Sequence, residues 1–136
     1  MAKSLLRVVV DTNVYYSALM YGGRPLEVLT LVLLDKVLVV SSQPLLSELR
    51  ELLEKKSDLH LAIIDEVIKE IESMSIIVQP RITIRAVRDA ADDMVIEAAA
   101  EGLCDYIVTG DRDLLALGSY QSIKIVTPAQ FLDLEL

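Results

Sequence analysis

The sequence is poor in the residues that most often carry covalent or soft-metal chemistry. Its 136 residues include one cysteine, one histidine, no tryptophan, five tyrosines and one phenylalanine. A single cysteine, Cys104, excludes an internal disulfide, and together with the single histidine, His60, it leaves a nitrogen–sulfur zinc site short of ligands. Cys104 as a nucleophile stays open, although small buried cysteines are common. Any bound metal would therefore be held by oxygen atoms, which favours Mg²⁺ or Mn²⁺.

Long apolar runs are also absent. No run approaches the roughly 20 apolar residues of a membrane-spanning helix, and the N-terminus has neither the apolar region nor the cleavage site of a signal peptide. We therefore expect a cytoplasmic protein without membrane contact. The length of 136 residues and the hydrophobic content of 53% predict one domain over residues 1–136, with a core of Leu, Ile, Val and Ala.

Positive charge is scarce. The formal net charge is −8, which argues against unaided nucleic-acid binding, because that binding is normally driven by basic surface. The charge fits a protein whose bound cations reverse the local field, or one that has a basic partner.

Short apolar runs alternate with segments of helical pattern. Predicted strands cover residues 6–10, 37–40, 76–78, 106–109 and 123–126. Predicted helices cover 13–21, 25–35, a segment from Ser42 to about 56, one from Ser57 or Asp58 to about 73, 90–101 with Gly102 at its C′ position, 112–117, and a last one from Pro128. Strands without a polar face that alternate with helices predict an α/β domain with a parallel sheet of about five strands.

Two aspartates follow predicted strands closely. Asp11 comes directly after VVV, and Asp111 follows the run YIVT by two positions. Because the carboxyl ends of parallel strands share one edge of the sheet, these acids from distant parts of the sequence can meet there. Each also stands where an aspartate can cap the following helix, so a purely structural role stays open for both.

Helical periodicity singles out Asp92. At about 100° per residue it lies on the apolar stripe of its helix, and a carboxylate there is costly unless it is paired or bound to a cation. The alternative is a helix-start residue in a frayed first turn. On the opposite side, which we expect to face solvent, lie Asp89, Asp93 and Glu97.

The position of Glu48 on its helix gives similar but weaker evidence for a functional carboxylate. It lies at the border of the leucine stripe of its helix, where a glutamate is usually a solvated flank. Clustered carboxylates repel one another unless divalent cations neutralise them. One or two Mg²⁺ or Mn²⁺ ions on such a cluster can activate water and stabilise the leaving oxygen in phosphodiester cleavage. Thr12, Asn13 and Thr109 lie at the same predicted sheet edge and can orient ligands or the attacking water.

Other readings fit less well. A phosphatase with an aspartyl nucleophile in a D-x-D motif needs a second acid where Asn13 stands. A phospho-receiver domain needs paired acids after the first strand and another aspartate at the end of strand three, and VLVVSSQ has none. A catalytically silent scaffold that binds RNA or protein also stays open.

Several stretches together resemble one family. VVVDTNVYYSAL, LLSELREL, RDAADDMVIEAA and YIVTGDRDLL are similar to the signature segments of PIN-domain nucleases, in order and at suitable spacing, and IKIVTPAQFL resembles that family's last strand and helix. The likeness is greatest to the VapC-type toxins of prokaryotic toxin–antitoxin systems. It implies a three-layer α/β/α fold and endonucleolytic cleavage of RNA with Mg²⁺ or Mn²⁺. The catalytic acids then correspond to Asp11, Glu48, Asp92 and Asp111, with Asp113 as a further metal ligand.

The resemblance also implies partners. VapC-like proteins commonly form homodimers and are inhibited by an antitoxin protein, and here the helices at 25–56 are our candidate dimer face. Arg112, between two acids, and Arg24, after a glycine pair, are our candidates for contacts with RNA phosphates. Arg81, Arg85 and Arg88 cluster before the helix that starts near Asp89.

Overall fold

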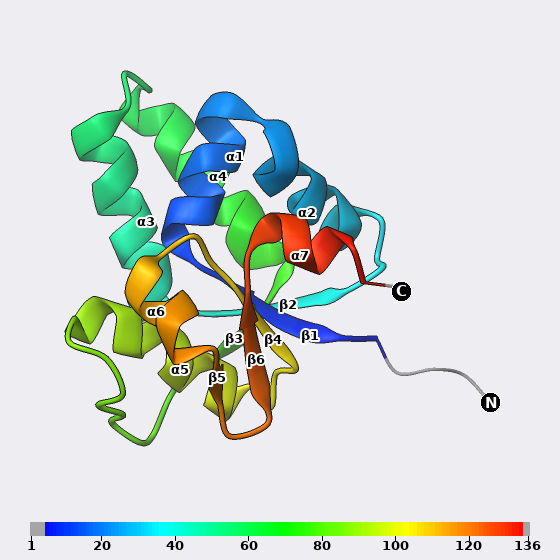
Figure 1. The fold of residues 1–136 in the computed structure, drawn as a ribbon. Helices are drawn as coiled ribbons and strands as arrows, with labels where there is room; N and C mark the ends of the chain where they lie inside the picture. The colour runs from blue at the N-terminus through cyan, green and yellow to red at the C-terminus, as the bar shows by residue number, and fades with distance from the viewer. Residues whose placement is uncertain (1–4, 135–136) are drawn as a thin grey trace.

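A six-stranded sheet runs through the middle of the molecule, with helices on both of its faces (Figure 1). The structure is a computed structural model that describes residues 5–134. The strands are β1 Arg7–Val10, β2 Leu38–Ser42, β3 Ser75–Val78, β4 Tyr106–Val108, β5 Ser119–Tyr120 and β6 Ile123–Val126. The helices are α1 Thr12–Tyr21, α2 Gly23–Leu33, α3 Gln43–Lys56, α4 Leu61–Ser73, α5 Ala90–Glu101, α6 Arg112–Leu117 and α7 Pro128–Leu132.

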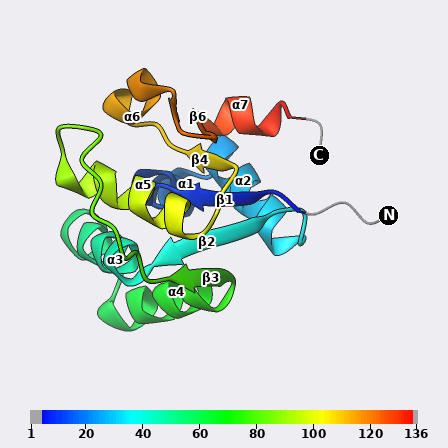
Figure 2. The same ribbon diagram turned by 90° about the horizontal axis from the view of Figure 1, so that it is seen from below.

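The strand order across the sheet is β3-β2-β1-β4-β6-β5. Figure 2 shows β3, β2, β1, β4 and β6 in this order from below. All neighbouring pairs are parallel except β5 and β6, which are antiparallel. The sheet has one strand more than the five predicted. The additional strand is β5, which has only two residues and contains no apolar run. Successive strands are added on one side of β1 up to β3, and the chain then returns to place β4 on the other side. The boundary between β1 and β4 is thus the switch point at which parallel sheets form their sites.

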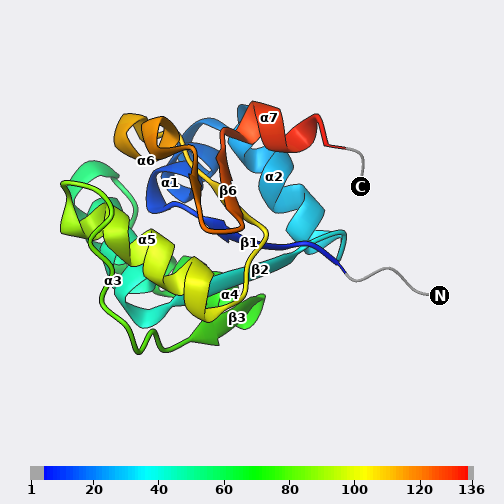
Figure 3. The same cartoon turned by 60° about the horizontal axis from the view of Figure 1, so that its bottom comes forward.

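The sheet separates two apolar cores, as the predicted three-layer α/β/α fold requires. Val8 and Val10 face one core together with residues of α1, α2, α3, α4 and α7. Val9, between them, faces the other core with residues of α5 and α6. Figure 3 shows α5 across this second face. The alternation along β1 explains its continuous apolar run, because both faces of a central strand are buried.

Several helix starts agree with the sequence. Ser42 accepts a hydrogen bond from the Leu45 N–H at the start of α3, and Asp89 accepts one from the Ala91 N–H at the start of α5. The predicted cap at Ser57 or Asp58 is wrong, because α4 begins only at Leu61. The Ser57 hydroxyl instead donates to the Leu53 carbonyl at the end of α3.

Gly102 follows α5 as predicted, but it does not adopt the left-handed conformation that is usual for glycine at the C′ position. Its φ is −82°, and the left-handed residue is the following one, Leu103, with φ 53°. A side chain at Gly102 would place its Cβ 2.6 Å from Cγ1 of Val40 in β2. Glycine is therefore needed here for close approach of the helix end to the sheet. Across residues 5–134, no helix is long and apolar enough to cross a bilayer.

Candidate active site

Asp11 and Asp111 lie on one edge of the sheet, at the carboxyl ends of the adjacent strands β1 and β4. The Asp11 N–H donates to the Val108 carbonyl at 3.0 Å, which continues the β1–β4 pairing to this point. Asp92 comes from the first turn of α5 and Glu48 from α3. The structure thus brings acids from four separate parts of the chain to the switch point of the sheet.

Asp11 is buried and is held by two threonines. Its Oδ2 accepts a hydrogen bond of 2.7 Å from the Thr109 hydroxyl, and its Oδ1 lies 3.4 Å from the Thr12 hydroxyl. Thr109 Oγ1 also accepts from the Asp111 N–H at 3.0 Å, so it joins the ends of β1 and β4. The Asp11 side chain does not cap α1, although it stands at the N-cap position. Burial raises the Asp11 pKa, the Thr109 bond opposes this effect, and the Asp111 charge adds to it.

Glu48 adjoins Asp11 through Thr12. The Thr12 hydroxyl donates to Glu48 Oε1 at 2.8 Å, the shorter of its two carboxylate contacts. Among the described residues, the buried Oε2 of Glu48 has no hydrogen-bond partner. Burial raises the pKa of Glu48, and the neighbouring charge of Asp11 raises it further. A buried carboxylate oxygen without a donor is a costly arrangement unless a cation faces it.

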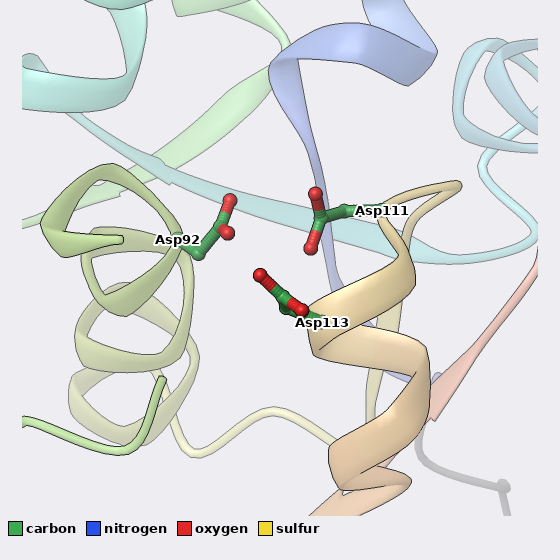
Figure 4. A group of neighbouring side chains, drawn as sticks. All are labelled: Asp92, Asp111 and Asp113. Atoms are coloured by element: carbon green, nitrogen blue, oxygen red, sulfur yellow. The ribbon is translucent and has the colours of Figure 1, made fainter. Parts of the chain in front are cut away.

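Three carboxylates converge beside this pair. Asp92, Asp111 and Asp113 each offer an oxygen within 4.8 Å of the others. Figure 4 shows the Asp92 side chain on α5 facing those of Asp111 and Asp113 at the start of α6. The pKa of Asp92 is raised to about 7, first by burial and then by the charges of Asp111 and Asp11. Like charges so close together make this a place where a cation is strongly favoured.

Asp111 has two functions in the structure. Its Oδ2 accepts a hydrogen bond from the Leu114 N–H at 3.0 Å and so caps α6, as the structural alternative proposed. The same side chain belongs to the carboxylate cluster. Capping therefore does not compete with a role in the site, because it orients the carboxylate toward Asp92.

The donor set fits a hard divalent cation. Every candidate ligand is a carboxylate oxygen, as Mg²⁺ and Mn²⁺ prefer. The unpartnered Glu48 oxygen and the raised pKa values of Asp11, Glu48 and Asp92 are what a carboxylate cluster shows without its counter-charge. The three-acid group contains Asp113, and Asp11 and Glu48 adjoin it rather than join it.

The prediction that Asp93 faces solvent is wrong. Asp93 is buried, and its Oδ1 accepts hydrogen bonds from the Ala86 and Val87 N–H groups at 2.8 and 3.0 Å. Glu97 is half-buried and accepts one from the Ile84 N–H at 2.8 Å. Residues 79–89, which we call the β3–α5 segment, cover this side of α5. Helical periodicity cannot reveal a covering segment that has no periodic pattern of its own.

A groove on the other side of Asp111 contains several of the predicted supporting residues. It is lined by Asn13, Val14, Ser17, Pro25, Gly110, Asp111, Arg112 and Pro128. Asn13 and Arg112 are exposed there. Arg24 is next to Pro25 in the chain and is exposed at the start of α2, where it forms an ion pair of 3.7 Å with Glu27. The only signal for Ser17 in the sequence is its spacing of four residues from Asn13, which places both on one side of α1.

Comparison with known proteins identifies the class. The PIN domain family matches residues 7–113, a span that contains Asp11, Glu48, Asp92, Asp111 and Asp113. The chain is also 32% identical over 146 aligned positions to the uncharacterized protein MJ1680 of Methanocaldococcus jannaschii, with 98% of this chain and 94% of that protein covered. The protein therefore belongs to the PIN-domain family, whose members are usually metal-dependent nucleases.

Proposed function

We propose that the protein is an endoribonuclease that depends on Mg²⁺ or Mn²⁺, with one or two ions at the carboxylate cluster. The observation that carries the proposal is the convergence of Asp92, Asp111 and Asp113, within 4.8 Å, beside the buried Asp11. Asp11, Glu48, Asp92 and Asp111 are the proposed catalytic carboxylates and metal ligands, and Asp113 is a further ligand. Family membership supports a nuclease at the coarser level.

The ligands in this proposal are held in place by their neighbours. A bound divalent ion supplies positive charge at the phosphate and lowers the pKa of a water molecule. Thr109 fixes Asp11 and the backbone of Asp111 together, and Thr12 fixes Glu48. Such outer hydrogen bonds orient ligands and tune their basicity. Asn13 is exposed in the adjoining groove, where its amide can orient the substrate or the attacking water.

RNA is the proposed substrate, and the groove beside Asp111 is its proposed path. Arg112 lines that groove, and Arg24 lies next to its wall, so we assign phosphate contacts to both. Arginine suits this role because its planar fork binds two phosphate oxygens at once. The choice of RNA rests on the resemblance to VapC-type enzymes.

The biological role we propose is that of the toxin in a VapBC-type toxin–antitoxin system in the cytoplasm. The acidic net charge of −8 suits a basic antitoxin partner. The exposed side chains of Leu26, Leu33 and Leu34 on and after α2 support a homodimer through this region. Sedimentation equilibrium of the protein alone and with its antitoxin would test both partners.

The decisive experiment uses labelled single-stranded RNA with EDTA, Mg²⁺ or Mn²⁺. We expect cleavage of internal bonds with either ion, none with EDTA, and none by the Asp11→Asn and Asp92→Asn variants. Cleavage that survives both substitutions would falsify the assigned site. Binding of RNA without cleavage under any of these conditions would support a silent scaffold instead. Expression of the wild type, but not of Asp11→Asn, should arrest growth if the protein is a toxin.

A further inference from the structure

The β3–α5 segment is tied down by three acids of one helix. Asp93, Glu97 and Glu101 are spaced four residues apart on α5. They accept hydrogen bonds from backbone N–H groups of Ala86 and Val87, of Ile84 and of Arg81, respectively. The Arg81 guanidinium adds an ion pair of 3.2 Å with Glu101. A segment without helix or strand is therefore held in one course along α5, toward the carboxylate cluster.

Arg88, the residue before the N-cap of α5, reaches the carboxylate cluster from this segment. Its guanidinium lies beside Asp113, with Nη2 at 3.2 and 3.3 Å from the two carboxylate oxygens. The Arg88 side chain is 88% exposed, whereas that of Asp113 is 40% exposed. An ion pair so open to water adds little to folding stability. The fixed segment thus presents a solvent-exposed cation at the edge of the proposed site.

Arg88 and Asp113 also line a shallow hollow between the β3–α5 segment and α6. Its other walls are small or apolar side chains, namely Ala86, Val87, Ala116 and Leu117. The groove that contains Arg112 lies on the α1 side of the same α6 start. The carboxylate cluster therefore has a cation on each of two sides. Although the chain has a net charge of −8, Arg88 and Arg112 provide positive charge next to the acids, where a polyanion could bind.

We propose that Arg88 is a substrate-binding residue that contacts an RNA phosphate in the hollow beside α6, and that Asp113 holds its guanidinium there before RNA arrives. This inference rests on the proposed function. The contact extends the RNA path past the cluster, from the Arg112 groove to the Arg88 hollow. The pairing also makes Arg88 a competitor of divalent cations for Asp113, because both are counter-charges of the same carboxylate.

The experiment compares Arg88→Ala with Arg85→Ala. Arg85 lies in the same segment, is exposed, and forms no ion pair within residues 5–134. Affinity for a single-stranded RNA is measured at several salt concentrations in an Asp11→Asn background that does not cut it. We expect Arg88→Ala to weaken binding about fivefold and to reduce the slope of log affinity against log salt by about 0.7, the value for one phosphate contact on a single strand.

Two further readouts separate a phosphate contact from a structural role. Arg88→Lys should restore most of the salt slope, because it keeps the charge. Titration with Mn²⁺ alone should show tighter binding in Arg88→Ala than in Arg85→Ala. If Arg88→Ala matches Arg85→Ala in RNA affinity and salt slope, the inference is overturned while the proposed function stands. If the wild type neither binds nor cuts RNA, both are overturned.

Discussion

Asp92 and Asp93 are neighbours in the chain with the same side chain, yet the structure gives them opposite surroundings. Asp93 is buried and its oxygen accepts two backbone hydrogen bonds. Asp92 is half-buried and faces other carboxylates, and its pKa is raised to about 7. One acid is satisfied by donors, and the other is surrounded by charges of its own sign.

Burial alone therefore does not distinguish a candidate metal ligand from a structural acid. Asp93, the more buried of the two, accepts hydrogen bonds from the backbone and holds the β3–α5 segment in place. Within residues 5–134 the less buried acid accepts no backbone hydrogen bond and faces charges of its own sign, an arrangement that favours a cation. What separates a structural acid from a candidate ligand is therefore the kind of group that faces it.

The largest difference should appear in catalysis. We expect Asp92→Asn to lower RNA cleavage by more than about 100-fold, because loss of a ligand should cost at least as much as loss of an outer-shell partner. Asp93→Asn, which keeps an oxygen acceptor, should retain most of the activity. Rates in saturating Mn²⁺ measure both variants. Equal loss in the two would show that the acids do not differ in function.

Stability should rank the same two positions in the reverse order. Asp93→Ala leaves the Ala86 and Val87 N–H groups without an acceptor, and we expect it to lower the free energy of unfolding by about 2–3 kcal/mol. Asp92→Asn should raise that free energy at pH 8 in EDTA, because it removes one of several repelling charges. Urea denaturation measures both. A destabilised Asp92→Asn protein would contradict the view that Asp92 lacks donors.

The dependence of folding stability on pH should reflect the raised pKa of Asp92. Its folded-state pKa of about 7 lies above the ordinary value of 3.8, so the folded state binds the proton more tightly than the unfolded state. In EDTA, stability should therefore fall as pH rises from about 4 to 7 and level off above that range. Asp92→Asn should make this fall shallower.

Glu101 changes the stability with pH in the opposite direction. Its hydrogen bonds with Arg81 lower its pKa below 4.5, so its contribution to stability is lost only in more acidic solution.

The smallest effect should come from Arg81 in the β3–α5 segment. Its side chain is 84% exposed where it pairs with Glu101, so solvent screens most of the interaction. We expect Arg81→Ala to shift the urea midpoint less than Asp93→Ala does, and the shift should vanish in high salt. An effect as large as that of Asp93→Ala would mean that the segment is held mainly by its ion pair.

The sequence was most informative where burial leaves a pattern. The continuous apolar runs of β1, β2 and β4 predict central parallel strands, and from these follows the shared edge of Asp11 and Asp111. Strand β5 has two residues, Ser119 and Tyr120, and carries no such pattern. Short edge strands depend on the hairpin that presents them, which a search for apolar runs does not detect.

The site was predictable to the extent that it depends on strand ends and helix faces. Periodicity placed Asp92 toward the sheet side of α5, but it could not anticipate that the β3–α5 segment covers Asp93. Asp113 could not be assigned from spacing, because its membership in the cluster depends on how α6 turns after Asp111. The Arg88–Asp113 pair joins two segments 25 residues apart, a contact that no local pattern encodes.

The position of β4 in the sheet has a consequence for the order of events during synthesis. Strand β4 lies between β1 and β6, although it is made long after β1. Until residues 106–108 leave the ribosome, one edge of β1 is open, and an open apolar edge can pair with other chains. Asp111 and Asp113 emerge later still. The carboxylate cluster can therefore form only after the strand that closes this edge of β1 has been made.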